Sequence, residues 1–388
     1  MKIGINGRFL GKPFTGIGQY TAGLIEELAQ ITPEHEYVVV VPENIGGGAE
    51  KDVLLDFPAN MRVHVLPGIK RGGAGTKKVW WEQLTVPAFF EKEKVDMAIF
   101  PYPCNPWYGS FYKKGIKVVV AAHDTVPWEN KKYRRGVLSK LYHLQSKKAL
   151  KKATLVLTVS GYSKERIEKV CHIDGKKIKV IYNGAWEGFK RPADAAIEKE
   201  ILEKFNLKKN KFFLYVGGYD ERKNVKKLIE EYFMFADKTD NPPALVLAGD
   251  RLFNNNLYVE VEDLTSGKDE QIIRTGFLEN EKLKALYQNC LCYVNLSKEE
   301  GFNIPIVEAA YSSAPMILSD IKVHREVAGN SAIFTDITTV GAPSKSLSKM
   351  LDQKTRDEYT QKSCELSKKY SWKLSAQKLK EVLFSGTN

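Results

Sequence analysis

The sequence has no long hydrophobic run and few cysteines. All of its apolar stretches fall short of the ~18 uncharged residues that a membrane-spanning helix needs, and the one within residues 1–7 is too short for a secretion signal. The five cysteines are scattered and lack the paired spacings of a zinc site or a disulfide framework. We therefore expect a cytoplasmic protein whose cysteines are buried thiols.

Several ligand-binding motifs are also missing. The chain has no Asp-x-Asp triplet, a common clamp for a metal-bound diphosphate, so we expect no metal site and no cofactor. Thr21 stands where a dinucleotide-binding Gly-x-Gly-x-x-Gly fingerprint starting at Gly16 would need its third glycine. No zinc finger, RNP-like aromatic motif or basic leucine-zipper pattern is present, which argues against a nucleic-acid partner.

Positive charge is concentrated in the first half of the chain. Of the net charge of +12, all arises in residues 1–184, which hold 29 Lys and Arg against 17 Asp and Glu, whereas residues 185–388 hold 30 of each. The basic segment 131–135 and the lysines of 147–152 bracket an apolar pattern of helical spacing from Val137 to Leu150. Such a helix suits an anionic membrane or a phosphate-bearing lipid, and equally a solvated helix face on a lysine-rich protein.

Short β-rich segments alternate with helical patterns, as in parallel-sheet proteins, and a chain of 388 residues is long for one core. A polar stretch at 183–211 interrupts the series, which predicts a linker. We predict an α/β protein with two doubly wound, Rossmann-like domains facing each other across a cleft, at residues 1–184 and 185–370, followed by a final helix within 371–388. The predicted strands are Ile3–Asn6, Tyr37–Val41, Arg62–Leu66, Met97–Phe100, Lys117–Ala122, Leu155–Val159, Lys179–Ile181, Phe212–Val216, Leu245–Ala248, Ile272–Thr275, Leu291–Asn295 and Met316–Leu318.

The segment Ser297–Ala310 carries the strongest chemical pattern. It follows a predicted strand and opens a helix, with Pro305 at an early helical position where its missing N–H costs nothing. The flexible Gly301 and the free N–H groups at the positive end of the helix dipole suit a phosphate. Glu300 and Glu308 lie eight residues apart, one on the loop and one in the helix, so each can accept hydrogen bonds from a different pair of ligand hydroxyls.

A second strand–turn–helix segment is Tyr215–Asn224. Gly217 and Gly218 form its turn, and Arg222 and Lys223 follow. These two cations could neutralise a diphosphate, the role that a metal has elsewhere. They could also be solvated cations at a helix start.

Two weaker signals follow other predicted strands. Gly16 and Gly18 lie in a predicted loop before the helix Tyr20–Leu28, where small residues let a ligand approach the backbone. His123 ends the predicted strand at 117–122, and we expect the neighbouring Asp124 to organise the loop. A single histidine in such a place is more often structural than catalytic.

Together these motifs resemble the family-four retaining glycosyltransferases of the GT-B fold, in particular the bacterial mannosyltransferase-type group 1 enzymes. Glu300 and Glu308, within the string Glu-Gly-Phe…Pro…Glu-Ala, match the E-x7-E motif of that family. Many members have Arg directly after the first glycine of the second motif, where this chain has Gly218, and Arg222 would replace it. Weaker matches, which extend the resemblance over nearly the whole chain, lie at 80–83, 158–163, 180–184, 325–329 and 370–372.

The resemblance implies a retaining, metal-independent hexosyltransferase that takes its sugar from a nucleotide diphosphate donor. It places Glu300 and His123 on the transferred sugar and Glu308 on the nucleotide ribose, and it returns the final helix to the first domain. The implied catalytic residues are His123, Arg222, Lys223 and Glu300. The implied donor-binding residues are Gly16, Gly18, Gly217, Gly218, Arg222, Lys223, Glu300, Gly301, Phe302, Asn303, Ile304 and Glu308.

The strings at 81–83 and 123–127 most resemble family members that use GDP-mannose, with UDP-hexoses and dTDP-rhamnose as alternatives. The basic first domain favours a glycan or lipid-linked glycan acceptor and peripheral contact with the inner face of the membrane. Two other classes remain open. One is a sugar-nucleotide epimerase of the same fold, and the other is a non-catalytic protein that binds lipid or nucleic acid.

Overall fold

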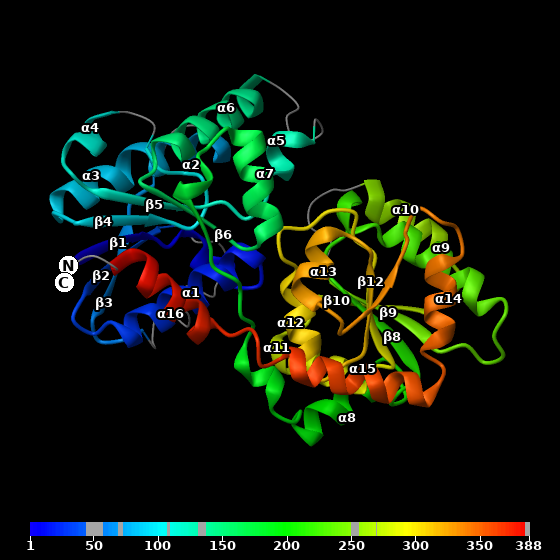
Figure 1. The fold of residues 1–388 in the computed structure, drawn as a ribbon. Coiled ribbons are helices and arrows are strands. Elements are labelled where there is room, and N and C mark those ends of the chain that lie inside the picture. The colour runs from blue at the N-terminus through cyan, green and yellow to red at the C-terminus, as the bar shows by residue number, and fades with distance from the viewer. Residues whose placement is uncertain are drawn as a thin grey trace. The chain divides into compact units, whose positions relative to one another are not determined.

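The computed structural model describes residues 1–43, 57–68, 73–106, 109–130, 137–249, 256–268 and 270–384. The chain divides into two compact units (Figure 1). Unit 1 comprises Met1–Gly184 together with Trp372–Asn388, and unit 2 comprises Ala185–Ser371. The basic segment 131–135 lies outside the described residues. None of the helices in the described ranges combines the length and the apolar character that crossing a bilayer requires.

Unit 1 is built on seven parallel strands in the order β3-β2-β1-β4-β5-β6-β7. Helices flank this sheet, so its strands read as continuous apolar runs, and Val38–Val41 of β2 are all buried. The strand order reverses between β1 and β4, and the crevice at such a reversal is where ligands of these sheets bind. The strands are β1 (Lys2–Asn6), β2 (Glu36–Pro42), β3 (Met61–Leu66), β4 (Met97–Phe100), β5 (Lys117–Ala121), β6 (Leu155–Thr158) and β7 (Ile178–Val180).

The helices of unit 1 include a short π-helix. This is η3 (Trp81–Thr85), between α2 (Ala74–Trp80) and α3 (Val86–Lys92). The other helical segments are η1 (Arg8–Gly11), α1 (Gly16–Ile31), α4 (Gly109–Lys113), α5 (Val126–Glu129), α6 (Val137–Lys152), α7 (Gly161–Cys171), η5 (Gly175–Lys177) and α16 (Trp372–Phe384).

Unit 2 repeats the parallel arrangement with six strands in the order β10-β9-β8-β11-β12-β13. The strands are β8 (Phe212–Val216), β9 (Ala244–Ala248), β10 (Ile272–Gly276), β11 (Cys292–Asn295), β12 (Met316–Ser319) and β13 (Ile333–Thr335). The helical segments are η6 (Glu187–Lys190), α8 (Ala195–Lys204), η7 (Glu221–Lys223), α9 (Val225–Ala236), α10 (Asn256–Thr265), α11 (Asn280–Asn289), α12 (Ile304–Tyr311), α13 (Lys322–Ala328), α14 (Ala342–Lys349) and α15 (Gln353–Leu366).

Every strand predicted from the sequence is present, with each boundary within one residue of its expected place. Several local predictions were wrong. The strand β13 was missed, and α1 begins at Gly16 rather than Tyr20 because the Thr15 hydroxyl caps it by accepting a hydrogen bond from Gly18 N at 3.1 Å. The stretch 183–211 is no free linker, since α8 packs on α11 and Phe189 is fully buried. The thiol of Cys364 is exposed rather than buried.

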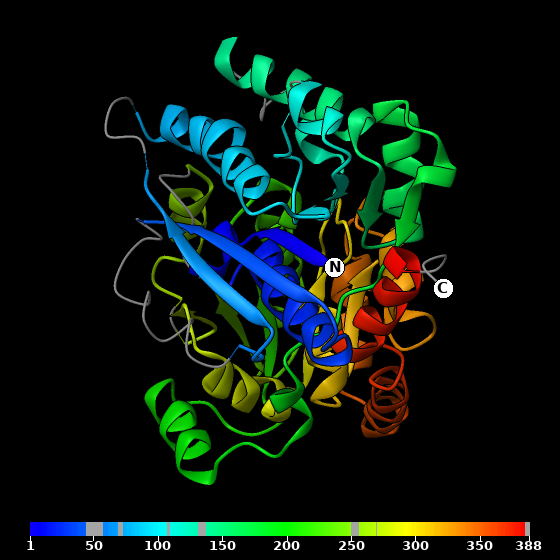
Figure 2. The same ribbon diagram turned by 90° about the vertical axis from the view of Figure 1, so that its left-hand side faces the viewer.

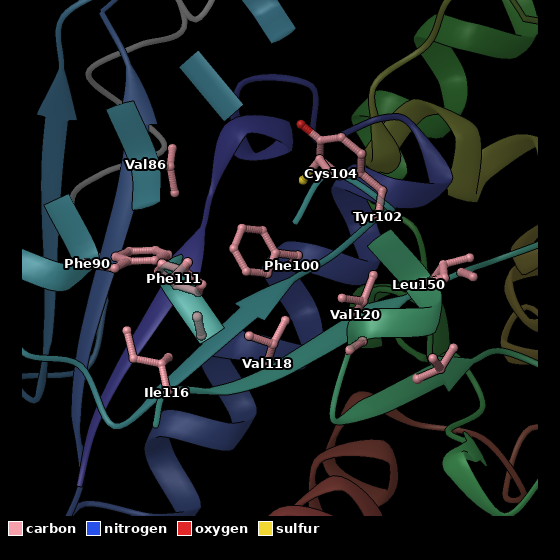
Figure 3. Close-up of a cluster of buried hydrophobic side chains, with 14 of the residues drawn as sticks. Val86, Phe90, Phe100, Tyr102, Cys104, Phe111, Ile116, Val118, Val120 and Leu150 are labelled. Atoms are coloured by element: carbon pink, nitrogen blue, oxygen red, sulfur yellow. The ribbon is translucent and has the colours of Figure 1, made fainter. Parts of the chain in front are cut away.

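Aromatic side chains fill the cores of both units. In unit 1, Phe90, Phe100 and Phe111 are fully buried among aliphatic side chains of β4, β5 and the neighbouring helices (Figure 3). In unit 2, Phe213 of β8 packs edge to face on Phe235 of α9, with ring centroids 5.5 Å apart. In each unit the core therefore holds the sheet in place, and the polar loops extend from the ends of its strands.

The helix α16 completes unit 1. It lies alongside α1, as both ribbon views show (Figures 1 and 2), and its Trp372 ring packs against Tyr20 with centroids 6.4 Å apart. A β-carbon at Gly23 of α1 would lie 2.5 Å from the indole nitrogen of Trp372, closer than packed atoms approach. The Ser375 hydroxyl adds a hydrogen bond to the Tyr182 carbonyl at 2.5 Å.

We expect Gly23→Ala to destabilise the protein by about 1–3 kcal/mol, because the added methyl group overpacks the contact with the rigid Trp372 ring. Urea unfolding followed by tryptophan fluorescence measures this change. Gly16→Ala in the same helix is the matched control, because outside its own stretch of helix no atom lies within 4 Å of a β-carbon there, and stability should hold or rise slightly. Equal stability of the two variants would contradict the packing of α16 on α1.

Candidate functional site

The loop between β11 and α12 is the centre of the candidate site in unit 2. The helix begins at Ile304, with Pro305 in its first turn and Asn303 before it at a φ of 76°. The Asn303 side chain makes no capping hydrogen bond to the helix, so it does not neutralise the positive end of the helix dipole. Such a helix start favours an anionic ligand.

Glu300, on this loop, is a buried carboxylate with three hydrogen-bond donors around it. Lys223 Nζ donates to Oε1 at 2.5 Å, Arg222 Nη1 donates to Oε2 at 2.6 Å, and the Ser297 hydroxyl donates to Oε1 at 2.8 Å. Burial alone would raise the pKa of Glu300, but the charges of Lys223 and Arg222 outweigh it and lower the pKa to about 2. The carboxylate is therefore ionised throughout the physiological range.

Arg222 and Lys223 reach Glu300 because the loop after β8 is hydrogen-bonded to the loop after β11. Lys298 N donates to the Arg222 carbonyl at 2.7 Å. The Asn224 side chain donates to the Leu296 carbonyl at 3.1 Å, and its positive φ of 58° ends η7 and opens α9. The two cations are thus fixed by main-chain contacts as well as by their ion pairs.

The turn after β8 depends on glycine. A β-carbon on Gly249, which follows β9, would lie 1.9 Å from the Gly217 carbonyl oxygen, and both glycines have φ values above +150° that other residues rarely adopt. The Tyr215 hydroxyl donates to the Gly218 carbonyl at 2.9 Å. Gly249 was not predicted from the sequence. It is needed because two loops far apart in the chain come so close that their backbones touch there.

Glu308 lies in α12 and is also buried, with Oε2 accepting a hydrogen bond from the Tyr287 hydroxyl at 3.0 Å. The side chains of Phe302 and Ile304 are buried as well, and Phe302 packs edge to face on Tyr370. Packing in the core explains why both side chains are large. If Phe302 and Ile304 contact a ligand, they therefore do so through their backbone groups.

His324, in α13, is a residue that sequence reasoning missed. Its ring is fully buried, Nδ1 lies 3.1 Å from the Ser319 carbonyl, and Nε2 lies 2.9 Å from the amide nitrogen of Asn303. Burial lowers the pKa of His324 to about 4, so the ring is neutral, with Nδ1 donating and Nε2 accepting. His324 thereby orients Asn303, and its position just after β12 was the signal that could have identified it.

Among the unit 1 predictions, His123 follows β5 and is half-buried. Its Nε2 donates to the Pro101 carbonyl at 2.7 Å, and its ring packs edge to face on Tyr20 at 4.7 Å. Burial lowers the pKa of His123, so the imidazole is neutral at neutral pH. The ring is therefore held in one orientation at the carboxyl edge of the sheet.

Gly16 and Gly18 do not form the predicted loop. Both lie in the first turn of α1, and a β-carbon on Gly18 would lie 1.9 Å from the Lys12 carbonyl oxygen. Packing of the helix start against the preceding turn is what requires glycine at position 18.

The structure thus brings three of the predicted catalytic residues together in unit 2 and places the fourth in unit 1. Gly217, Gly218, Gly301, Asn303 and Glu308 lie in or beside the same loops of unit 2 as Glu300. Within the described ranges, no three His, Cys, Asp or Glu side chains are arranged to hold a metal ion.

Two family models match the chain and together cover most of it. The description "Glycosyltransferase Family 4" applies to residues 14–185, and "Glycosyl transferases group 1" applies to residues 197–366. The chain belongs to the group 1, family-four glycosyltransferases. It is therefore a retaining glycosyltransferase with the GT-B fold, as the resemblance predicted.

Several curated relatives are bacterial mannosyltransferases. O-antigen chain mannosyltransferase B of Escherichia coli is 28% identical over 93% of each chain. O-antigen chain mannosyltransferase RfbU of Salmonella typhimurium is 31% identical over 56% of each chain. Among solved structures, Anabaena HepE in complex with UDP and glucose matches with a TM-score of 0.75 at 16% identity over 99% of each chain, and the lipopolysaccharide glycosyltransferase WaaG matches at 0.72 and 14% over all of each chain. The structural matches support the fold.

We expect Glu300→Gln to destabilise the protein by about 3 kcal/mol at pH 7, because it removes the carboxylate that pairs with the part-buried Lys223 and leaves Arg222 with the more distant Asp220, at 3.8 Å. The folded-state pKa of about 2 lies below the ordinary value of 4.5, so the stability from this carboxylate is present above pH 4.5 and is lost as the pH falls toward 2. Urea unfolding of both proteins between pH 7 and pH 2.5 should show the difference shrinking. Glu358→Gln, which removes an exposed ion pair with Lys362, is the control and should cost under about 0.5 kcal/mol. A pH-independent difference would contradict the assignment.

Proposed function

We propose that the enzyme transfers mannose from GDP-mannose, with retention of anomeric configuration, to a glycan or lipid-linked glycan acceptor. The mannosyltransferase names of the relatives support the sugar. Both named enzymes build O-antigen chains, which supports an acceptor that is itself a glycan. We also expect cytoplasmic action, at the inner face of the membrane if the acceptor carries a lipid.

The observation that carries the proposal is the joint placement of Glu300, Arg222 and Lys223 beside the start of α12. Two fixed cations and a helix N-terminus suit a diphosphate, and a carboxylate within 3 Å of them suits sugar hydroxyls. We propose that unit 2 binds the donor in this way, with Glu308 on the nucleotide ribose. Arg222 would then replace the arginine that many family members carry at the position of Gly218.

In the proposed reaction, the bond from the anomeric carbon to the diphosphate oxygen breaks while the acceptor oxygen bonds to the same face of the sugar. The acceptor proton passes to the departing phosphate oxygen. Arg222 and Lys223 would stabilise the developing negative charge, so that the reaction needs no metal ion. Glu300 and the neutral His123 would bind hydroxyls of the transferred sugar.

The alternatives differ in their support. UDP-hexose and dTDP-rhamnose donors need only a different contact to the base, and the likeness to HepE supports the fold without choosing among bases. The epimerase and the non-catalytic binding protein lose support, because the chain belongs to a family of glycosyltransferases. Peripheral membrane contact rests on the lysines of α6, of which Lys147 also donates to the Val170 carbonyl.

Metal-free thermal-shift and calorimetric titrations with GDP, UDP, dTDP and their hexose conjugates test the donor. We expect GDP and GDP-mannose to bind, and a ligand present at 100 times its Kd should stabilise the fold by about 2.7 kcal/mol. Binding of UDP or dTDP, but not GDP, would show that the donor carries uracil or thymine instead of guanine. Failure of every nucleotide, with and without magnesium, would overturn the proposed donor site.

We expect Lys223→Ala and Glu308→Gln each to weaken donor binding roughly 10- to 100-fold, because each removes a charge-assisted hydrogen bond to the ligand. Calorimetry with GDP-mannose measures the loss, and circular dichroism checks the fold. Lys282→Ala is the matched control, since this exposed lysine pairs with Glu200 on the surface of unit 2 and its loss should leave donor affinity unchanged. Wild-type affinity in both site variants would contradict the assignment.

A further inference from the structure

A further buried carboxylate, Glu82, lies in unit 1. Glu82 sits on the π-helix η3 and its side chain is fully buried. The Tyr102 hydroxyl donates to Oε1 at 2.6 Å, with Arg8 Nη1 at 3.5 Å and Lys78 Nζ at 3.8 Å from the same oxygen. The other oxygen, Oε2, is equally buried and has no hydrogen-bond partner.

An unpartnered buried carboxylate oxygen is costly, because it has lost water without gaining a donor. Three groups lie within 4 Å of Oε1, whereas Oε2 has no hydrogen-bond partner, so the cluster is incomplete on one side. A π-helical turn in place of a regular α-helix is also frequent at functional sites.

The place of the cluster in the fold is that of a ligand site. Arg8 lies two residues after β1 and Tyr102 two residues after β4, and the strand order of unit 1 reverses between these two strands. Figure 3 shows Tyr102 at the edge of the labelled core cluster, beside Cys104. The Pro101 carbonyl, next to Tyr102, holds His123.

Part of the cluster is open to a ligand. The side chains of Arg8 and Lys78 are each 29% exposed. Lys78 Nζ also donates to the Tyr142 hydroxyl at 3.4 Å, and Tyr142 lines a small cavity together with Gln83 and Asn105. Asn105 contributes a further buried oxygen, Oδ1, that has no partner.

The chemistry favours a ligand that carries hydroxyl groups. A hydroxyl can donate to Glu82 Oε2 and accept from Arg8 or Lys78 at once, whereas a phosphate mainly accepts hydrogen bonds and has little to donate to Oε2. At Glu300 both carboxylate oxygens already accept hydrogen bonds, so a ligand there need not donate. We infer that Glu82, Arg8 and Lys78 form a saccharide-binding site that holds the acceptor glycan through its hydroxyl groups. This inference rests on the proposed function, in which unit 1 is the acceptor-binding unit.

Ligand-observed NMR titration of the full chain with methyl α-D-mannopyranoside, methyl α-D-glucopyranoside and inorganic phosphate tests the site. We expect saturable binding of at least one glycoside, no competition by phosphate, and an affinity at least roughly tenfold weaker in Glu82→Gln. Because Glu82 is buried, Arg8→Gln, at a part-exposed position, provides a second variant that should fold and show the same loss. Glu91→Gln, which removes a surface ion pair with Lys114 in unit 1, is the control and should bind like the wild type.

Three outcomes would overturn the inference: no glycoside binding by the wild type, displacement of the glycoside by phosphate, or unchanged glycoside affinity in folded Glu82→Gln and Arg8→Gln. If the glycoside still binds to these variants but not to Glu300→Gln, its binding site lies in unit 2, and the inference is again overturned. A GDP titration of the same samples separates the two hypotheses. Absence of GDP binding counts against the proposed donor. The change in glycoside affinity caused by Glu82→Gln tests the site in unit 1.

Discussion

Glu300 holds two loops of unit 2 in one arrangement by pairing with a different cation on each carboxylate oxygen. Arg222 and Lys223 are adjacent in the chain and would repel each other if both were buried without a counter-charge. The carboxylate removes that repulsion while no ligand is bound. A diphosphate could take over the same role without any large movement of the cations, so the groups that would bind the donor are already in position.

The topology of the sheets explains why charges separated by many residues meet. In unit 2 the order reverses between β8 and β11, so the loops that follow these strands are neighbours, and they carry Arg222, Lys223 and Glu300. In unit 1 the reversal lies between β1 and β4, and there Arg8 approaches Glu82 beside Tyr102. Each unit thus has a buried glutamate with two basic partners at the corresponding point of its own sheet.

Much of the fold could be predicted because buried parallel strands leave a simple trace. Runs such as Val38–Val41 have few other interpretations in a chain with helical patterns between them. The short β13 was missed because three residues at a sheet edge carry little pattern. The start of α1 was misplaced because Gly16 and Gly18 suggested a loop, whereas the Thr15 cap and the contact of Gly18 with the Lys12 carbonyl decided the local structure.

The site was predictable where a single local string carried it, as with Glu300 and Glu308. Gly249 and the surroundings of Glu82 depend on contacts between segments far apart in the sequence, which no local pattern records. His324 had a local signal in its position just after β12, but its contact with Asn303 became visible only in the fold. Glu82 lay within a string that the resemblance had singled out, yet its burial and its unpartnered oxygen became visible only in the folded structure.

The packing of α16 on α1 also affects how the chain folds during synthesis. The strands of unit 1 leave the ribosome first, but residues 372–384 emerge only after all of unit 2 has been made. Until then the surface of α1 around Gly23 has no covering helix, and exposed apolar surface on a nascent chain invites aggregation. Unit 1 can therefore complete its fold only after unit 2 has been synthesised. A chaperone that binds the uncovered face of α1 would act during this interval.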